Sequence, residues 1–171
     1  MIVVIPMAGQ GKRFQQTGYT FPKPLIPIRN KPMLQWVVES LDMPWAKHIF
    51  VVRREDYERY PLEEVCAQLV HDAHVVIDDH PEGAATSVLL GLTGPQSMTE
   101  NLLIANADQW LEWDSNNFLK AALALGVDGA IPVFRSVHPK RSYARVEEGK
   151  VTEVAEKRPI SPWATCGLYY W

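Results

Sequence analysis

The chain has 171 residues, 47% of them hydrophobic and 22% charged, and its formal net charge is −3. This length and composition predict one globular domain over residues 1–171. A slightly acidic chain is not expected to bind nucleic acid or an anionic membrane through a broad basic surface. The N-terminal apolar run is too short for a signal peptide or a membrane helix, and Cys66 and Cys166 follow no metal-site spacing. We therefore expect a cytoplasmic protein with reduced thiols.

The first predicted strand, residues 2–5, leads into a glycine-rich loop, and a helix follows over residues 33–41. A loop at the carboxyl end of a strand lies where open α/β sheets bind ligands. Gly9 and Gly11 would let backbone N–H groups approach an anion closely. The loop therefore predicts an anion site.

Two basic residues of this segment, Arg13 and Lys23, would add positive charge to that site. Neither common phosphate-loop pattern fits. A P-loop needs Ser or Thr where Arg13 stands, and a dinucleotide fingerprint needs a third glycine where Phe14 stands. A tight turn with solvated basic side chains is the alternative interpretation.

The next predicted elements are a strand at residues 48–52, a helix at 55–69 and a short strand at 75–77. Between them, His71 and His74 are three residues apart, a separation that suits a metal pair on a helix. No third ligand accompanies them in the sequence. We therefore interpret them as solvated or capping histidines.

Small residues mark the start of another predicted helix, at Gly83, Ala84 and Ala85. They would allow a flat base or a ribose to approach exposed backbone N–H groups. The alternative is that they only let the helix pack closely on the sheet. Asp78 or Asp79, just before this turn, is a candidate to accept a hydrogen bond from the base.

An apolar strand at residues 101–105 runs directly into Asp108. A carboxylate just past the end of a central strand can hold Mg²⁺ against phosphate oxygens. A turn or N-cap aspartate is the alternative. Trp110 and Trp113 follow, and they either wall an acceptor pocket or pack against the sheet.

The remaining pattern predicts a helix, a strand, a basic connection, a β-hairpin and a final strand, at residues 118–125, 129–134, 135–141, 143–154 and 164–171. The basic connection holds His138, Lys140 and Arg141. We expect these side chains to be exposed, although one of them could reach a phosphate.

Three segments resemble the signatures of one known family: the Gly-x-Gly-x-Arg loop with its later Pro-Lys-Pro, the Asn-x-Asp-Gln segment that ends at Gln109, and the pair Glu156-Lys157. The family is the sugar-phosphate nucleotidyltransferases, or nucleoside-diphosphate-sugar pyrophosphorylases. Its members join a nucleoside triphosphate (NTP) to a sugar phosphate or a related phosphate and release pyrophosphate. The resemblance covers nearly all of the chain. It implies an α/β, Rossmann-like fold of GT-A type, with a mostly parallel mixed sheet and helices on both faces.

The resemblance also implies a Mg²⁺-dependent site for an NTP and a phosphorylated small-molecule acceptor. The residues implied in nucleotide binding are small: Ala8, Gly9, Gly11, Gly83, Ala84 and Ala85. The residues implied in catalysis are charged: Arg13, Lys23, Asp108 and Lys157, with Asp108 as the Mg²⁺ ligand. The residues implied in acceptor binding follow the hairpin: Glu156, Lys157 and Gly167. A salt bridge at the hairpin end is the alternative for the pair Glu156-Lys157.

Family members continue for further elements, one of which supplies a second metal-binding aspartate, so we expect C-terminal elements to be missing. That absence favours a second hypothesis, a non-catalytic nucleotide-sensing or scaffold domain. A GT-A glycosyltransferase is a third, although its usual Asp-x-Asp is here Asn106-Ala107-Asp108. The resemblance points to CTP or UTP, a sugar 1-phosphate and capsule polysaccharide biosynthesis. The sequence leaves homo-oligomerisation open.

Overall fold

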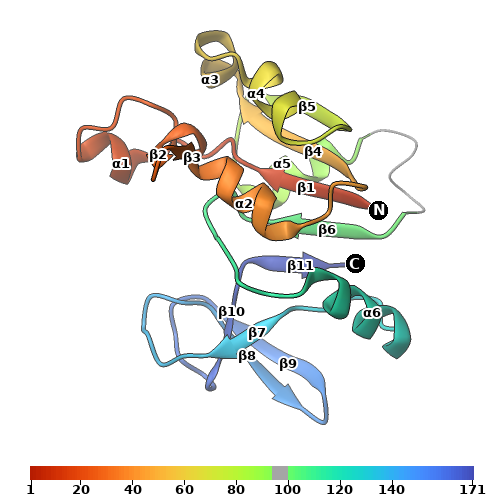
Figure 1. Ribbon diagram of the computed structural model, residues 1–171. Helices are drawn as coiled ribbons and strands as arrows, with labels where there is room; N and C mark the ends of the chain where they lie inside the picture. The colour runs from red at the N-terminus through yellow and green to blue at the C-terminus, as the bar shows by residue number, and fades with distance from the viewer. Residues whose placement is uncertain (94–99) are drawn as a thin grey trace.

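Two sheets organise the chain in the computed structural model, which describes residues 1–93 and 100–171 (Figure 1). The first sheet has the strand order β11-β6-β1-β4-β5. Its strands are β1 (Ile2–Pro6), β4 (Lys47–Arg53), β5 (Ala73–Asp78), β6 (Leu102–Ala105) and β11 (Leu168–Tyr170). All neighbours pair in parallel except β11, which is antiparallel to β6. The predicted mostly parallel mixed sheet is confirmed.

Helices cover both faces of this sheet, as predicted. One face packs on α2 (Met33–Leu41), α4 (Leu62–Leu69) and α6 (Ser115–Leu125), and the other on α5 (Ala84–Gly91). Successive side chains of β1 point to opposite faces, so Val3 packs with Leu34 of α2 while Val4 packs with Val88 of α5. Both faces of β1 are therefore apolar, as a central parallel strand requires. No helix within residues 1–93 and 100–171 is long and apolar enough to cross a membrane.

The second sheet is antiparallel, has the order β7-β10-β8-β9, and lies below the first in Figure 1. Its strands are β7 (Val133–Arg135), β8 (Tyr143–Glu147), β9 (Lys150–Ala155) and β10 (Trp163–Thr165). The predicted hairpin, β8–β9, is confirmed. The single strand predicted at 164–171 is wrong: Gly167 adopts a φ of +74° and divides it into β10 and β11, one in each sheet. The strand predicted from residue 129 begins only at Val133.

Two other segments also differ from prediction. The helix expected at 55–69 is two helices, α3 (Arg54–Arg59) and α4. Pro61 explains the break, because proline disfavours a helical conformation at the residue before it, here Tyr60. The loop after β1 contains α1 (Lys12–Gln16), a 3₁₀ turn η1 (Lys23–Leu25) and the small hairpin β2 (Pro27–Ile28) and β3 (Lys31–Pro32).

Both cysteines are free and buried. Burial raises the pKa of the Cys66 thiol to about 12 and also raises the pKa of Cys166. A thiol with a raised pKa stays protonated near neutral pH and is a poor nucleophile. Neither cysteine takes part in a disulfide among the described residues.

A buried histidine in β4 makes stability depend on pH. The His48 Nδ1 lies 3.0 Å from the Ala46 carbonyl oxygen, whereas Nε2 is buried with no partner among the described residues. Burial lowers the pKa of His48. As the pH falls through about 6.5, the unfolded chain takes up a proton on His48, whereas the folded chain takes up this proton only at a lower pH. Stability is full above that pH and declines as the pH falls through the folded pKa.

We expect the urea midpoint of the wild type to fall between about pH 7.5 and about pH 5.5 by more than that of His48→Gln, which has no imidazole to protonate. Urea unfolding followed by circular dichroism at the two pH values measures this difference. Equal pH dependence in both proteins would show that His48 does not couple folding to protons.

Candidate functional site

An ion pair joins two segments that lie far apart in the sequence. Lys23 Nζ, at the start of η1, contacts Asp108 Oδ2, just past β6 and 85 residues away. The Lys23 ammonium also lies 5.7 Å from the centroid of the Phe14 ring. Both side chains of the pair are about one-third exposed, at 29% and 36%. The structure thus brings two of the predicted catalytic residues together at an accessible position.

A cavity of about 230 Å³ lies between the loop after β1 and the turn that precedes α5. Four of the predicted nucleotide-binding residues line it: Ala8, Gly9, Gly83 and Ala84. A Cβ added at Gly83 would meet nothing within 4 Å, whereas one at Gly91 would lie 3.0 Å from Val51 Cγ2. Close packing of α5 on the sheet therefore depends on Gly91, which leaves the turn at Gly83 open to a ligand.

Gln10 and Glu82 also line this cavity, and the prediction missed them. Their only signal in the sequence is that each stands beside a predicted glycine. Both are polar and exposed, so they can supply hydrogen bonds that glycine side chains cannot.

The other predicted nucleotide-binding residues lie outside the cavity. Gly11 caps α1 with a φ of +59°, and its backbone packs beside Lys23. Arg13, one of the predicted catalytic residues, is also outside it: it is exposed on α1 and has no ion pair among the described residues. Ala85 lines a separate apolar hollow of about 540 Å³ beside Tyr169.

The two aspartates before α5 already have protein partners. Asp78 is buried and accepts hydrogen bonds from Ser87 Oγ at 2.7 Å and from the His80 amide at 3.1 Å. Arg54 Nε donates to Asp79 Oδ1 at 2.6 Å, and this hydrogen bond lowers the pKa of Asp79. Asp78 therefore holds the turn onto α5, and Asp79 holds it to α3.

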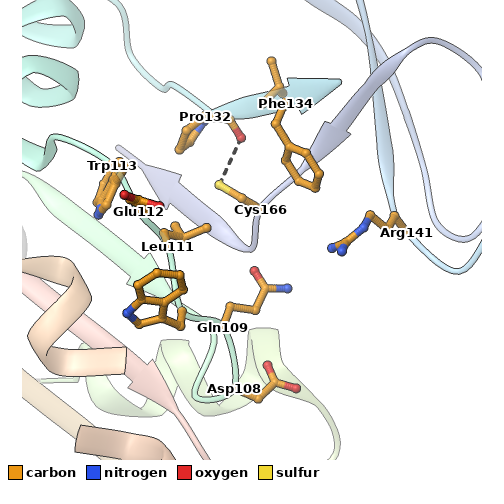
Figure 2. A pocket seen from close by; sticks show the side chains of 11 residues that line it. Asp108, Gln109, Leu111, Glu112, Trp113, Pro132, Phe134, Arg141 and Cys166 are labelled. Atoms are coloured by element: carbon orange, nitrogen blue, oxygen red, sulfur yellow. Dashed lines mark hydrogen bonds between the residues drawn. The ribbon is translucent and has the colours of Figure 1, made fainter. Parts of the chain in front are cut away.

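A second cavity, of about 530 Å³, lies between the segment after β6 and the second sheet (Figure 2). Asp108 and Trp110 line it from one side, and Phe134, Arg141 and Cys166 from the other. Trp110 is 57% exposed, as an accessible wall requires.

Trp113 lines the same cavity but is also anchored to the first sheet's helical layer. Its indole Nε1 donates to the Ser40 carbonyl oxygen of α2 at 2.7 Å. The two tryptophans therefore differ: Trp110 forms a wall of the cavity, and Trp113 mainly packs against the helical layer.

Gly167 lies against the Asn-x-Asp-Gln segment rather than in open space. The backbone N–H of Asn106 donates to the Gly167 carbonyl oxygen at 3.0 Å. A Cβ on Gly167 would collide with the side chains of Asn106 and Gln109. Gln109 Oε1 is buried and has no partner in the part of the chain that the structure describes. The absence of a side chain at Gly167 thus leaves the space that the Gln109 amide occupies.

We expect Gly167→Ala to lower the free energy of unfolding by about 1–3 kcal/mol through its left-handed backbone, and by a smaller further amount because the ends of the Gln109 and Asn106 side chains must shift. Gly149→Ala is the matched control, because Gly149 has a φ of +78° and nothing within 4 Å of its would-be Cβ. Urea unfolding compares the two variants. Equal destabilisation would mean that the contact with Gln109 does not matter.

Glu156 and Lys157 contact each other in the turn after β9. The hydrogen bond from Lys157 lowers the pKa of Glu156. Both side chains are exposed, and neither lines the two cavities. The geometry agrees with the alternative reading, a salt bridge at the hairpin end.

The residues near the cavities suit a metal ion that takes most of its ligands from substrate phosphates and water, rather than one coordinated by protein side chains alone. Within residues 1–93 and 100–171, no group of three or more His, Cys, Asp or Glu side chains could hold a metal. Mg²⁺ commonly uses one or two carboxylates and takes its other ligands from phosphates and water. Asp108 suits that role, being exposed at the end of a central strand. His74 instead pairs with Asp72 at 2.7 Å.

Comparison with known proteins gives consistent matches. A model of the MobA-like NTP transferase domain matches residues 3–159. The bifunctional protein GlmU of Methanocaldococcus jannaschii is 25% identical over 174 residues, which cover 99% of this chain and 39% of that protein. GlmU of Clavibacter sepedonicus is 30% identical over 107 residues, covering 62% of this chain and 21% of that protein. The chain therefore spans well under half the length of these relatives.

Solved structures agree on the fold. The nucleoside-diphosphate-sugar pyrophosphorylase of Vibrio cholerae RC9 superposes with a TM-score of 0.80 at 26% identity, covering 99% of this chain and 72% of that one. A UDP-glucose pyrophosphorylase complexed with UDP-glucose superposes with a TM-score of 0.77 at 20% identity, covering 99% and 74%. The second likeness supports the fold alone.

Proposed function

Because the chain belongs to the MobA-like NTP transferase family, we propose that it transfers the nucleoside monophosphate of an NTP to a phosphorylated small molecule and releases pyrophosphate. A sugar 1-phosphate is the first acceptor class to test. The observation that carries the proposal is the contact between Lys23 and Asp108. It joins the glycine-rich loop, which borders one cavity, to the residue that lines the other.

The proposed arrangement assigns one substrate to each cavity. The nucleoside end of the NTP takes the cavity lined by Gly9 and Gly83, where backbone N–H groups at the start of α5 are accessible. The acceptor takes the cavity of about 530 Å³ that Asp108 lines. The α-phosphate then lies between them, beside Lys23.

In the reaction, an oxygen of the acceptor phosphate attacks the α-phosphorus in line. A new P–O bond forms, the bond to the bridging oxygen breaks, and pyrophosphate leaves. The acceptor phosphate is already ionised near neutral pH, so no general base is needed. Catalysis therefore consists of positioning and neutralisation of the charge on the transferring group.

The charged side chains have distinct proposed roles. Lys23 moves from Asp108 to the α-phosphate, and Arg13 on the exposed α1 reaches the β- and γ-phosphates. Asp108, released by Lys23, would hold Mg²⁺, which when bound neutralises phosphate oxygens. Lys157 is the acceptor-phosphate contact that the family resemblance implies.

The narrower proposals concern the donor, the pathway and the location. We propose CTP or UTP as the donor and an activated sugar for capsule or other surface polysaccharide as the product. The supporting observations are the Asn-x-Asp-Gln form of the segment ending at Gln109 and the Phe-Pro-Lys-Pro-Leu context of Lys23. A cytoplasmic location suits a protein whose two cysteines are free.

The test is pyrophosphate release with Mg²⁺ from CTP, UTP, dTTP, GTP and ATP, each with a panel of sugar 1-phosphates and other phosphorylated acceptors. Acceptor-dependent release from one NTP is the expected result. Nucleotide binding without any release would favour the sensing or scaffold role. Release of a nucleoside diphosphate from a sugar nucleotide would favour a glycosyltransferase.

A further inference from the structure

Arg141 presents a cation to the cavity that Asp108 lines. The residue lies in the connection between β7 and β8, where its amide donates to the His138 carbonyl oxygen at 3.2 Å. Its guanidinium carbon is 5.0 Å from the centroid of the Phe134 ring. Arg141, Phe134 and Asp108 line the same cavity of about 530 Å³. The aromatic ring thus holds the guanidinium at the edge of a space that Asp108 also borders.

The charge of Arg141 is not neutralised within the protein. Among residues 1–93 and 100–171 no carboxylate forms an ion pair with it, whereas Arg145 and Arg158 both pair with Glu153. Lys157 likewise has Glu156 as its partner. A guanidinium stacked on a ring keeps its N–H groups free at the edges, where they can form two parallel hydrogen bonds to a phosphate.

A second polar group lies on the opposite wall of the same cavity. Figure 2 shows the Gln109 amide and the Arg141 guanidinium extending toward each other from the two sides. The amide oxygen of Gln109 is buried without a partner among the described residues, and the absence of a Cβ at Gly167 leaves room for it. An amide N–H group that extends toward Arg141 can donate to the same ligand oxygen atoms that Arg141 binds.

We propose that Arg141 also binds the phosphate of the acceptor, in addition to the contact proposed for Lys157. This inference rests on the proposed nucleotidyl transfer, in which that phosphate must lie beside the α-phosphate and therefore near Asp108. Arg141 borders the cavity that Asp108 lines, and Lys157 does not. Arg141 then helps to select phosphorylated acceptors over neutral ones.

The first experiment compares steady-state constants for the acceptor and for the NTP. Arg141→Ala should raise the KM for the acceptor by roughly 10- to 100-fold, the loss expected for a charge-assisted hydrogen-bonded pair, and leave the KM for the NTP unchanged. Arg141→Lys should recover part of the loss, because lysine keeps the charge but not the fork. Lys140→Ala is the matched control: Lys140 is the neighbouring exposed cation, and it does not line the cavity.

An unchanged acceptor KM in Arg141→Ala would overturn the proposal.

A second measurement separates this proposal from the proposed reaction. Inorganic phosphate is titrated without nucleotide, and the guanidinium Nε–Hε resonance of Arg141 is followed by NMR, assigned by its loss in Arg141→Ala. A shift in the wild type and in Lys140→Ala is expected even if no NTP and acceptor pair gives turnover. An Arg141 resonance that does not respond to phosphate would overturn the assignment, whatever the activity assays show.

Discussion

Replacing Lys23 by alanine is expected to lower kcat by roughly 100- to 1000-fold, equivalent to about 3–4 kcal/mol of barrier, with the fold retained. In the proposed reaction its ammonium neutralises charge on the α-phosphate, and that charge is greatest in the transition state. Its pair with Asp108 is partly exposed, so its loss should cost no more than about 1 kcal/mol of stability. Initial rates of pyrophosphate release give the first effect, and urea unfolding gives the second.

Lys12→Ala is the matched control for this experiment. Lys12 is an exposed lysine of the same glycine-rich segment, and it has no assigned role. It should retain turnover near that of the wild type. Near-wild-type turnover in Lys23→Ala, or a loss of turnover as large in Lys12→Ala, would remove Lys23 from the mechanism.

Asp108→Asn is expected to lower activity by a similar factor, roughly 100- to 1000-fold at a fixed Mg²⁺ concentration. The substitution keeps the shape of the side chain and removes the charge that attracts the metal. The activity that remains should require more Mg²⁺ than that of the wild type, because a neutral amide oxygen is the weaker ligand. A Mg²⁺ titration of the initial rate measures both effects.

Glu112→Gln provides the control, because Glu112 is a carboxylate that lines the same cavity and has no assigned role. Its Mg²⁺ dependence should match that of the wild type. If Asp108→Asn kept the wild-type Mg²⁺ dependence and rate, Asp108 would not be the metal ligand.

The sequence predicts the first sheet well because its signals are local. The run Ile2–Ile5 is apolar on both faces, and α2 repeats its apolar residues with helical spacing. The second sheet was predicted only in its hairpin, β8–β9, because its other two strands, β7 and β10, are three residues long and carry little periodic signal. The strand expected at 164–171 illustrates this: a single left-handed glycine, Gly167, sends its two halves to different sheets.

Site residues could be predicted from the sequence where a single loop or turn contains them. Gly9 and Gly83 stand out in the sequence, and the structure brings them to one cavity. Lys157 was assigned through the family resemblance, and the structure instead shows it paired with Glu156. From the sequence, Arg141 was only one of several basic residues in a connection. Its position opposite Gln109 depends on how the two sheets pack together, which no local sequence pattern indicates.

The most direct test of nucleotidyl transfer follows the α- and γ-phosphates of the NTP separately, with a radioactive label in one or the other. The protein is incubated with Mg²⁺, the acceptor and an NTP that carries ³²P in either the α or the γ position. We predict that the α label enters an acceptor-dependent product and that the γ label appears only in pyrophosphate. Transfer of the γ label to the acceptor, or an α label found only in free nucleotide, would contradict the account.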